Sequence, residues 1–191
     1  MNELYFPEAV VLDREDSNDI DSRFSIYAKG YGKLYAKAKS ARKILSKLSG
    51  HLQPGSLVKI RLVGNGAWQV ADALKVSSIK CQVSDLYLLN QLLPEADFDL
   101  GIWEMLTEGS PSSLRRSDSE ESSESMSSSG REFSWSKTLK ILGWDPEYAL
   151  CSRCHKVKPS VFDIGGQEFW CTECFSGKEL AGRDGHLKSG N

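Results

Sequence analysis

Acidic residues are missing from one long stretch of this chain. Residues 22–71 form fifty positions without one Asp or Glu, although the whole chain has 26 acidic and 24 basic residues. The stretch contains ten cations: Arg23, Lys29, Lys33, Lys37, Lys39, Arg42, Lys43, Lys47, Lys59 and Arg61. Residues 3–21 are the reverse, with seven acids against one arginine. A net charge of −2 therefore conceals a cationic block, which attracts nucleic acid or an anionic membrane surface, or serves solubility alone.

Other absences exclude several classes of protein. No apolar run approaches the roughly 20 residues of a membrane span, and residues 1–10 lack the basic patch of a signal peptide. The five cysteines, four of them in two close pairs, do not suit a secreted disulfide framework. There is no phosphate-binding Gly-x-x-x-x-Gly-Lys-[Ser/Thr] loop, and the three histidines have no catalytic partner pattern. We therefore expect a cytoplasmic protein that is not an enzyme.

Short segments of alternating polarity fill the first 75 residues. The expected strands are residues 8–13, 23–29, 33–39, 57–63 and 67–74. The segments Gly30-Tyr31-Gly32 and Gly64-Asn65-Gly66 mark turns. Leucines three and four residues apart predict a short amphipathic helix within residues 40–52. Five strands with a helix between the third and fourth indicate an OB-type β-barrel. A small SH3-like barrel fits the strand pattern nearly as well.

The remaining sequence predicts helices, a loop and a cysteine element. Apolar residues recur at helical spacing from about residue 76, again around residues 98–106 and again at residues 135–142. Between the last two, a Ser-rich acidic segment at about 108–131 can bury too little apolar surface to offset chain entropy, so we expect it to be disordered. The expected fold class is α+β, with an N-terminal five-stranded OB-type β-barrel followed by a small α-helical domain with a four-cysteine zinc element. The expected domains are the basic barrel at 1–75, the helical domain at 76–150, the zinc-binding element at 151–175 and a flexible tail at 176–191.

The cysteine quartet has the spacing of a structural zinc site. Cys151-x-x-Cys154 and Cys171-x-x-Cys174 are sixteen residues apart, and the residues between them suit a hairpin that brings the pairs together. Four thiolates at about 2.3 Å close a tetrahedron around the ion and leave no open coordination position. Such a zinc ion stabilises the fold and performs no chemistry.

Three other chemistries fit parts of this motif. The segment from Cys151 to His155 is formally a Cys-x-x-Cys-His haem attachment sequence, but a second cysteine pair then has no role. An iron–sulfur cluster is possible on the ligands alone, although two symmetric pairs suit zinc better. Redox dithiols are a further alternative.

Cations and tyrosines alternate along the second and third expected strands, which is typical of a surface for single-stranded nucleic acid. Ammonium groups follow the phosphates, and tyrosine rings stack on unpaired bases with little sequence preference. The candidate contacts are Lys29, Tyr31, Lys33, Tyr35, Lys37, Lys39, Arg42, Lys43, Lys47, Lys59 and Arg61. The alternative is a solvated strand face whose lysines discourage edge pairing, with the tyrosines partly in the core. We expect no membrane partner, because the cations lie mainly on strand patterns without a large exposed apolar face.

Several segments, in order along the chain, resemble the bacterial RecO family of DNA repair and recombination mediators. These segments are residues 28–34, 38–42, 52–54, 92–95, 102–106 and 142–147, the last leading into Cys151-x-x-Cys154. The resemblance covers about residues 5–107 and 133–175. Family members usually continue for several helices beyond the second cysteine pair, whereas this chain has only residues 175–191 there, and the acidic segment is also unusual.

The resemblance implies a particular function and set of partners. It implies an OB domain, a helical domain and a zinc element that bind single- and double-stranded DNA, anneal complementary strands and help load RecA together with RecR and single-strand-binding protein. The rival interpretation is a general RNA-binding or translation-associated factor built from an OB domain and a zinc ribbon. A third is an adaptor whose barrel binds only protein.

Overall fold

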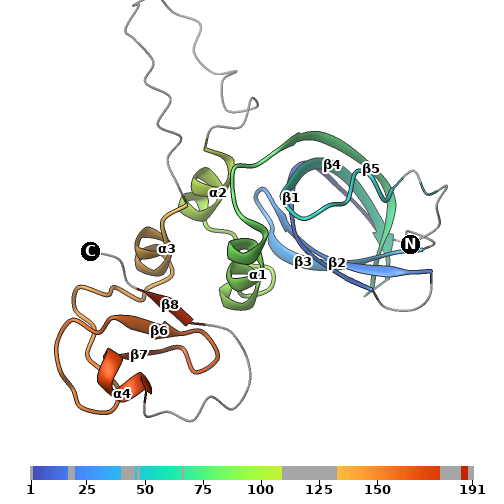
Figure 1. Cartoon of the computed structure of the whole chain (residues 1–191). Helices are drawn as coiled ribbons and strands as arrows, with labels where there is room; N and C mark the ends of the chain where they lie inside the picture. Colours follow the sequence, from blue (N-terminus) through green and yellow to red (C-terminus); the bar gives the residue numbers. More distant parts are fainter. Residues whose placement is uncertain are drawn as a thin grey trace, which may run out of the picture. The chain divides into compact units, whose positions relative to one another are not determined.

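The computed structural model shows two compact units, Met1–Phe133 and Ser134–Asn191 (Figure 1). The residues it describes are 2–16, 20–39, 46, 48–65, 67–108 and 133–176, with the backbone of 186–188. The fold is a mixture of α and β, with a five-stranded sheet, a few helices and a cluster of four cysteines. Among the described residues, no helix has both the length and the apolar character that a membrane crossing requires.

The first unit is built around a closed sheet of five strands. Its strands are β1 (Asn2–Asp16), β2 (Ser22–Ala28), β3 (Gly32–Ala38), β4 (Ser56–Gly64) and β5 (Trp68–Ser78). Their order is β1-β2-β3-β5-β4, and β4 pairs back with β1. All these contacts are antiparallel except that of β3 with β5, which is parallel and involves the pairs Ala36–Trp68 and Lys37–Gln69. The five expected strands are all present.

The long strand β1 closes the sheet because it pairs with two neighbours. Its first half lies against β4 and its second half against β2, and the pairing shifts register between Phe6 and Ala9 and again between Val11 and Asp13. Such irregularities bend a strand and increase its twist. A strand bent in this way can follow the curve of a closed sheet (Figure 1).

Alternation along the strands produces the core of the first unit. On β3, Leu34, Ala36 and Ala38 are buried, as the sequence pattern predicts. The core also contains alternate apolar residues of β2 and β4: Phe24, Ile26, Val58, Ile60 and Leu62. Strand side chains alternate between the two faces of a sheet, so Tyr35 and Lys37 are left on the outer face of β3.

Two helices belong to the same unit as the sheet. They are α1 (Val83–Leu92) and α2 (Leu100–Thr107). The sequence pattern predicts helix from about residue 76, but β5 continues to Ser78, and helix α1 begins only at Val83. The apolar residues of segment 76–79 therefore belong to the end of a strand and the connection after it. Helix α2 begins where the Asp99 carboxylate accepts a hydrogen bond from the Ile102 N–H at 3.0 Å.

The second unit contains the cysteine element. Its elements are α3 (Trp135–Ile141), β6 (Val161–Asp163), β7 (Glu168–Trp170), α4 (Thr172–Ser176) and β8 (His186–Lys188). The three strands form a sheet in the order β7-β6-β8. Helix α3 and the hairpin of β6 with β7 agree with the sequence pattern, and Gly143, just after α3, has φ of 91°. Strand β8 lies in the segment for which the sequence predicts only a flexible tail.

Three predictions fall mainly outside the described residues. They concern most of the insertion helix at 40–52, the acidic segment at about 108–131 and most of the tail at 176–191.

Candidate functional site

The four cysteines of the second unit lie together. Their sulfur atoms are all within 4.8 Å of one another, and those of Cys154 and Cys171 are 3.6 Å apart. A tetrahedral ion with metal–sulfur distances of about 2.3 Å requires sulfurs roughly 3.8 Å apart. The side chains therefore fit a four-coordinate metal ion with small adjustments, and an all-thiolate donor set suits a soft or borderline ion.

Backbone geometry prepares the first cysteine pair for a cation. The chain turns at Cys151–Cys154, where the His155 N–H donates to the Cys151 carbonyl at 2.9 Å and His155 has φ of 56°. Backbone N–H groups, foremost that of Cys154 and then those of Cys171 and Arg153, lower the pKa of the Cys151 thiol to about 6. Cys151 is thus largely a thiolate at neutral pH, and the thiolate is the form that binds metal.

The second pair is arranged around the start of a short helix. Cys171 precedes α4 and Cys174 lies within it, and the Phe175 N–H donates to the Cys171 carbonyl at 3.0 Å. A hydrogen bond with the Cys171 thiol, together with burial, raises the pKa of Cys174 to about 12. Metal binding must therefore displace the proton of Cys174 at neutral pH.

Side chains beside the quartet hold its two halves together. Lys156 follows the first pair and contacts Glu173 of the second, with Nζ and Oε2 2.8 Å apart. Between the pairs in the sequence, Phe162 of β6 is fully buried and packs against Phe169 and Trp144 at ring distances of 4.8 and 5.4 Å. This small aromatic core supports the hairpin between the pairs.

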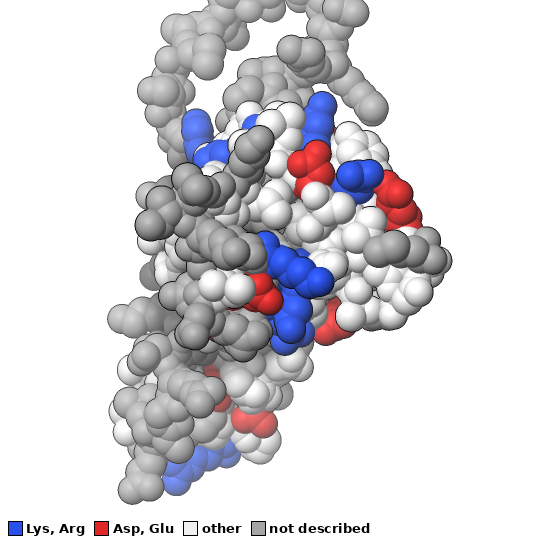
Figure 2. Space-filling view, turned by 90° about the vertical axis from the view of Figure 1, so that its right-hand side faces the viewer, with Lys and Arg blue, Asp and Glu red and all other residues white. Residues whose placement is uncertain are grey.

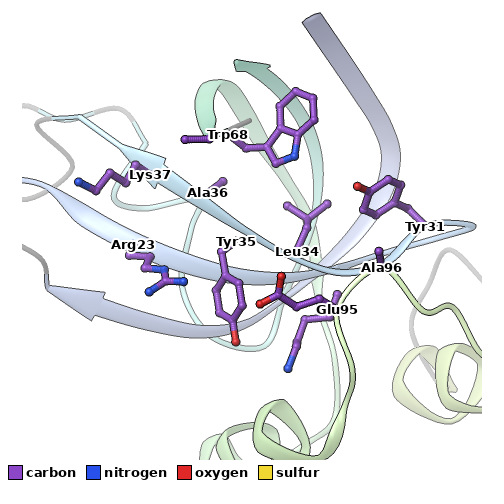
Figure 3. Close-up of a pocket in the computed structure, with 11 residues that line it drawn as sticks. Arg23, Tyr31, Leu34, Tyr35, Ala36, Lys37, Trp68, Glu95 and Ala96 are labelled. Atoms are coloured by element: carbon purple, nitrogen blue, oxygen red, sulfur yellow. The ribbon is translucent and has the colours of Figure 1, made fainter. Parts of the chain in front are cut away.

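A second candidate site is an open groove of about 500 Å³ in the first unit, along β3 (Figure 3). Its lining residues are Arg23, Tyr31, Lys33, Leu34, Tyr35, Ala36, Lys37, Ala67, Trp68, Glu95 and Ala96. Aromatic rings and cations thus line the same groove, which is the combination that single-stranded nucleic acids require.

Pairing of the strands explains where the groove lies. Strand β5 contacts β3 through Trp68 and Gln69, whereas residue 33, nearer the start of β3, forms a bridge with Glu95 instead. In Figure 3, Trp68 and Tyr31 lie on one side of β3, with Leu34 between them. Tyr35 and Glu95 lie on the other side. The groove therefore presents aromatic rings on both sides of the strand.

Arg23 of β2 is part of this arrangement. Its guanidinium carbon lies 4.3 Å from the centre of the Tyr35 ring, which is a cation–π distance. Burial raises the pKa of Tyr35 above its ordinary value, and the nearby Glu95 raises it further. Tyr35 therefore stays neutral at physiological pH.

The structure separates the predicted cations into several environments. Lys37 and Lys39 are exposed at the end of β3, and Lys59 is exposed on β4. Lys29 pairs with Glu8, and Arg61 lies 3.5 Å from Glu3. The remaining three on the insertion, Arg42, Lys43 and Lys47, are outside the described residues.

Lys33 has a different position from its neighbours on β3. Only 6 % of its surface is exposed, and its Nζ donates to the Asn90 carbonyl of α1 at 2.8 Å. Burial lowers its pKa, while the charge of Glu95 partly offsets this effect. Lys33 thus fixes α1 to the sheet, and its charge is directed away from a phosphate on the surface.

On the face in Figure 2, the described lysines and arginines do not form one continuous cationic surface. On the face in Figure 2, lysine and arginine side chains lie in separate groups, and acidic side chains lie beside several of them. Lys59 and Arg61 are on β4, which β5 separates from β3. The groove along β3 therefore contains only part of the predicted set: Tyr31, Lys33, Tyr35 and Lys37.

Sequence reasoning did not single out Arg23, Trp68 and Glu95 as site residues. Arg23 belongs to the acid-free stretch and begins the second expected strand, but it was not chosen as a site residue. Trp68 comes two residues after the Gly64-Asn65-Gly66 turn. The loop before the last strand of an OB barrel takes part in ligand binding, so this position was a usable signal. No sequence signal places Glu95 beside β3.

Comparison with known proteins adds no family to this description. No model of a protein family matches the chain, and no curated protein matches it significantly.

Proposed function

We propose that this protein binds single-stranded nucleic acid along the β3 groove, without catalysing a reaction. The observation that carries the proposal is the presence of three aromatic residues, Tyr31, Tyr35 and Trp68, in one groove with Arg23 and Lys37. Each base stacked on such a ring contributes about 1–3 kcal/mol, and each neutralised phosphate adds a salt-dependent contribution.

The strand order supports an OB type for the closed sheet. OB barrels have five strands in a Greek-key arrangement and bind oligonucleotides on the face of strands 2 and 3 with nearby loops. Here the groove takes Arg23 from β2, Tyr35 and Lys37 from β3, and Trp68 from the start of β5. The ligand surface expected for that type of barrel and the observed groove thus coincide.

The sequence resemblance to RecO favours DNA as the ligand and strand annealing as the role. In this proposal the protein holds a DNA strand by its phosphates and by a few stacked bases, and a second strand pairs with the remaining bases. The resemblance also suggests RecR and single-strand-binding protein as partners in loading RecA. We propose zinc as the ion of the cysteine quartet, because four thiolates in a closed tetrahedral arrangement are typical of structural zinc sites.

Binding of a labelled oligonucleotide of about 16 nucleotides tests the proposed groove. We expect Trp68→Leu and Tyr35→Leu each to weaken binding by roughly five- to 100-fold, which corresponds to loss of one stacked base. Lys37→Glu should weaken binding and reduce the salt slope by about 0.7 for each phosphate that is no longer neutralised. Lys75→Glu is the matched control, since Lys75 is exposed on β5 and does not line the groove. Equal effects of Lys37→Glu and Lys75→Glu would contradict the proposal.

Two further measurements identify the class of ligand. Competition between DNA and RNA strands of one sequence, and annealing of complementary DNA oligonucleotides, separate a recombination mediator from an RNA-binding factor. We expect preference for DNA and faster annealing. Preference for RNA without annealing would favour the RNA-binding alternative, and failure to bind any oligonucleotide at low salt would favour a protein adaptor.

A further inference from the structure

The segment that follows α1 is fixed against the edge of β3. The Ala96 N–H donates to the Lys33 carbonyl at 2.8 Å, and Glu95 forms a parallel bridge with Lys33. Ala96 has φ of 55°, a left-handed conformation that is uncommon for a residue other than glycine. A strained backbone of this kind persists only where its surroundings enforce it, and it often accompanies a functional position.

Gly32 allows this close approach. A Cβ atom at Gly32 would lie 2.2 Å from the carbonyl oxygen of Asp97, so no other residue fits without displacing the segment. Gly32 itself has φ of 93°. A glycine at the first position of β3 is therefore required for the close contact with residues 95–97.

This packing places an exposed carboxylate in the groove. The Glu95 side chain points into the groove beside Tyr35, while Arg23 lies farther along the same side (Figure 3). Lys37 adds a second exposed cation toward the end of β3. Phosphates are attracted to Arg23 and Lys37 and repelled by Glu95. In the proposed binding of single strands, the phosphates would therefore contact the cations, and a base edge would face the carboxylate.

We propose that Glu95 makes the groove selective for guanine, an inference that rests on the proposed binding of single strands. A carboxylate only accepts hydrogen bonds, through two oxygens. Guanine alone presents two adjacent donors on its Watson–Crick edge, N1–H and N2–H, and both are free in a single strand. Thymine, adenine and cytosine each place a repelling acceptor next to their donor. Paired charge-assisted bonds are stronger than single ones, so guanine is favoured.

Glu95→Gln tests the proposal with four labelled oligonucleotides of one length. They are oligo-dT, oligo-dA, oligo-dT with two central guanines and the same strand with inosine, which lacks the N2 amino group, in place of guanine. We expect the wild-type protein to bind the guanine strand about tenfold more tightly than oligo-dT, which is typical of a base contact made by two hydrogen bonds. The affinity for the inosine strand should lie between these two affinities. In Glu95→Gln the preference should disappear while affinity for oligo-dT rises, because a charge that repels phosphates is gone.

Glu104→Gln is the matched control, since Glu104 is an exposed acid on α2 that does not line the groove. It should leave both affinities unchanged. Equal wild-type affinity for the guanine and thymine strands, or an unchanged preference in Glu95→Gln, would overturn the inference while leaving the proposed function intact. Failure of the wild-type protein to bind any of the four strands would instead overturn the proposed function and this inference together.

Discussion

Lys33 is buried, whereas Lys37 on the same strand is exposed. The last carbonyls of a helix lack partners within the helix and carry partial negative charge. Lys33 supplies a positive donor to one of them, the Asn90 carbonyl of α1, from a position that is almost fully buried. The favourable hydrogen bond is thus opposed by the free energy of removing an ammonium group from water.

This opposition predicts a pH-dependent stability. The pKa of Lys33 in the folded protein is below its ordinary value of 10.5, so between these two values the unfolded chain binds more protons than the folded protein. The free energy of unfolding contributed by Lys33 therefore rises with pH across that window. Compared with Lys33→Met, the wild-type protein should gain stability as pH rises from neutral toward 10.5, measured by thermal denaturation. A constant difference between the two proteins over that range would show that the pKa of Lys33 is not lowered.

Single residues of the sites were predictable to different degrees. The four cysteines were predictable because their spacing alone fixes which side chains meet. Strand periodicity identified Tyr35 and Lys37 as outward residues, since the period of two is a local property. Strand periodicity did not reveal that Lys33 is buried. Asn90 of α1 and Glu95, which contact Lys33, lie more than fifty residues away along the chain.

At the scale of elements, the contact of β3 with residues 95–97 can be tested through its glycines. Gly32→Ala places a methyl group on the Asp97 backbone, and we expect it to destabilise the protein by about 2–4 kcal/mol, from steric overlap together with its positive φ. Gly30→Ala is the matched control. Gly30 also has positive φ, at 76°, but an added Cβ meets nothing within 4 Å, so a cost of only about 1 kcal/mol is expected. Chemical denaturation of both variants measures the difference. Equal losses of stability would show that residues 95–97 move away from the added methyl group at no cost in free energy.

The boundaries of elements were less predictable than their existence. Five strands, the glycine turn before β3 and the hairpin of β6 with β7 follow from local alternation and turn residues. The extension of β5 to Ser78 does not, because Ser77 and Ser78 are held in the strand by pairing with Leu57 and Ser56 of β4. Helical spacing beyond residue 75 was misleading there, since a short apolar run fits either period. Strand β8 likewise depends on pairing with β6.

At the scale of the whole molecule, the two units are expected to respond separately to loss of metal. Cys151→Ser removes one ligand of the proposed zinc site, and structural zinc sites of this kind contribute about 10 kcal/mol or more to folding. We expect loss of bound zinc and unfolding of the second unit, whereas the affinity of the full chain for oligonucleotides changes little, because the groove belongs to the first unit. Zinc analysis, calorimetry and binding measurements on the same preparation test this.

Ser152→Ala provides the control for that experiment, since Ser152 is an exposed neighbour of the same turn. It should retain zinc and unfold at the same temperature as the wild-type protein. Full zinc content in Cys151→Ser would contradict the assignment of the site, and loss of nucleic-acid binding in that variant would show that the two units depend on each other.

The pairing of β1 has a practical consequence for handling the protein. Asn2 is opposite Gly64 on β4, and Gly64 is opposite Trp68 on β5, so the start of β1 and an aromatic residue of the groove are separated by one strand. A purification tag or fluorescent label joined ahead of Asn2 would therefore start near Trp68 and compete for space with a ligand of the proposed groove.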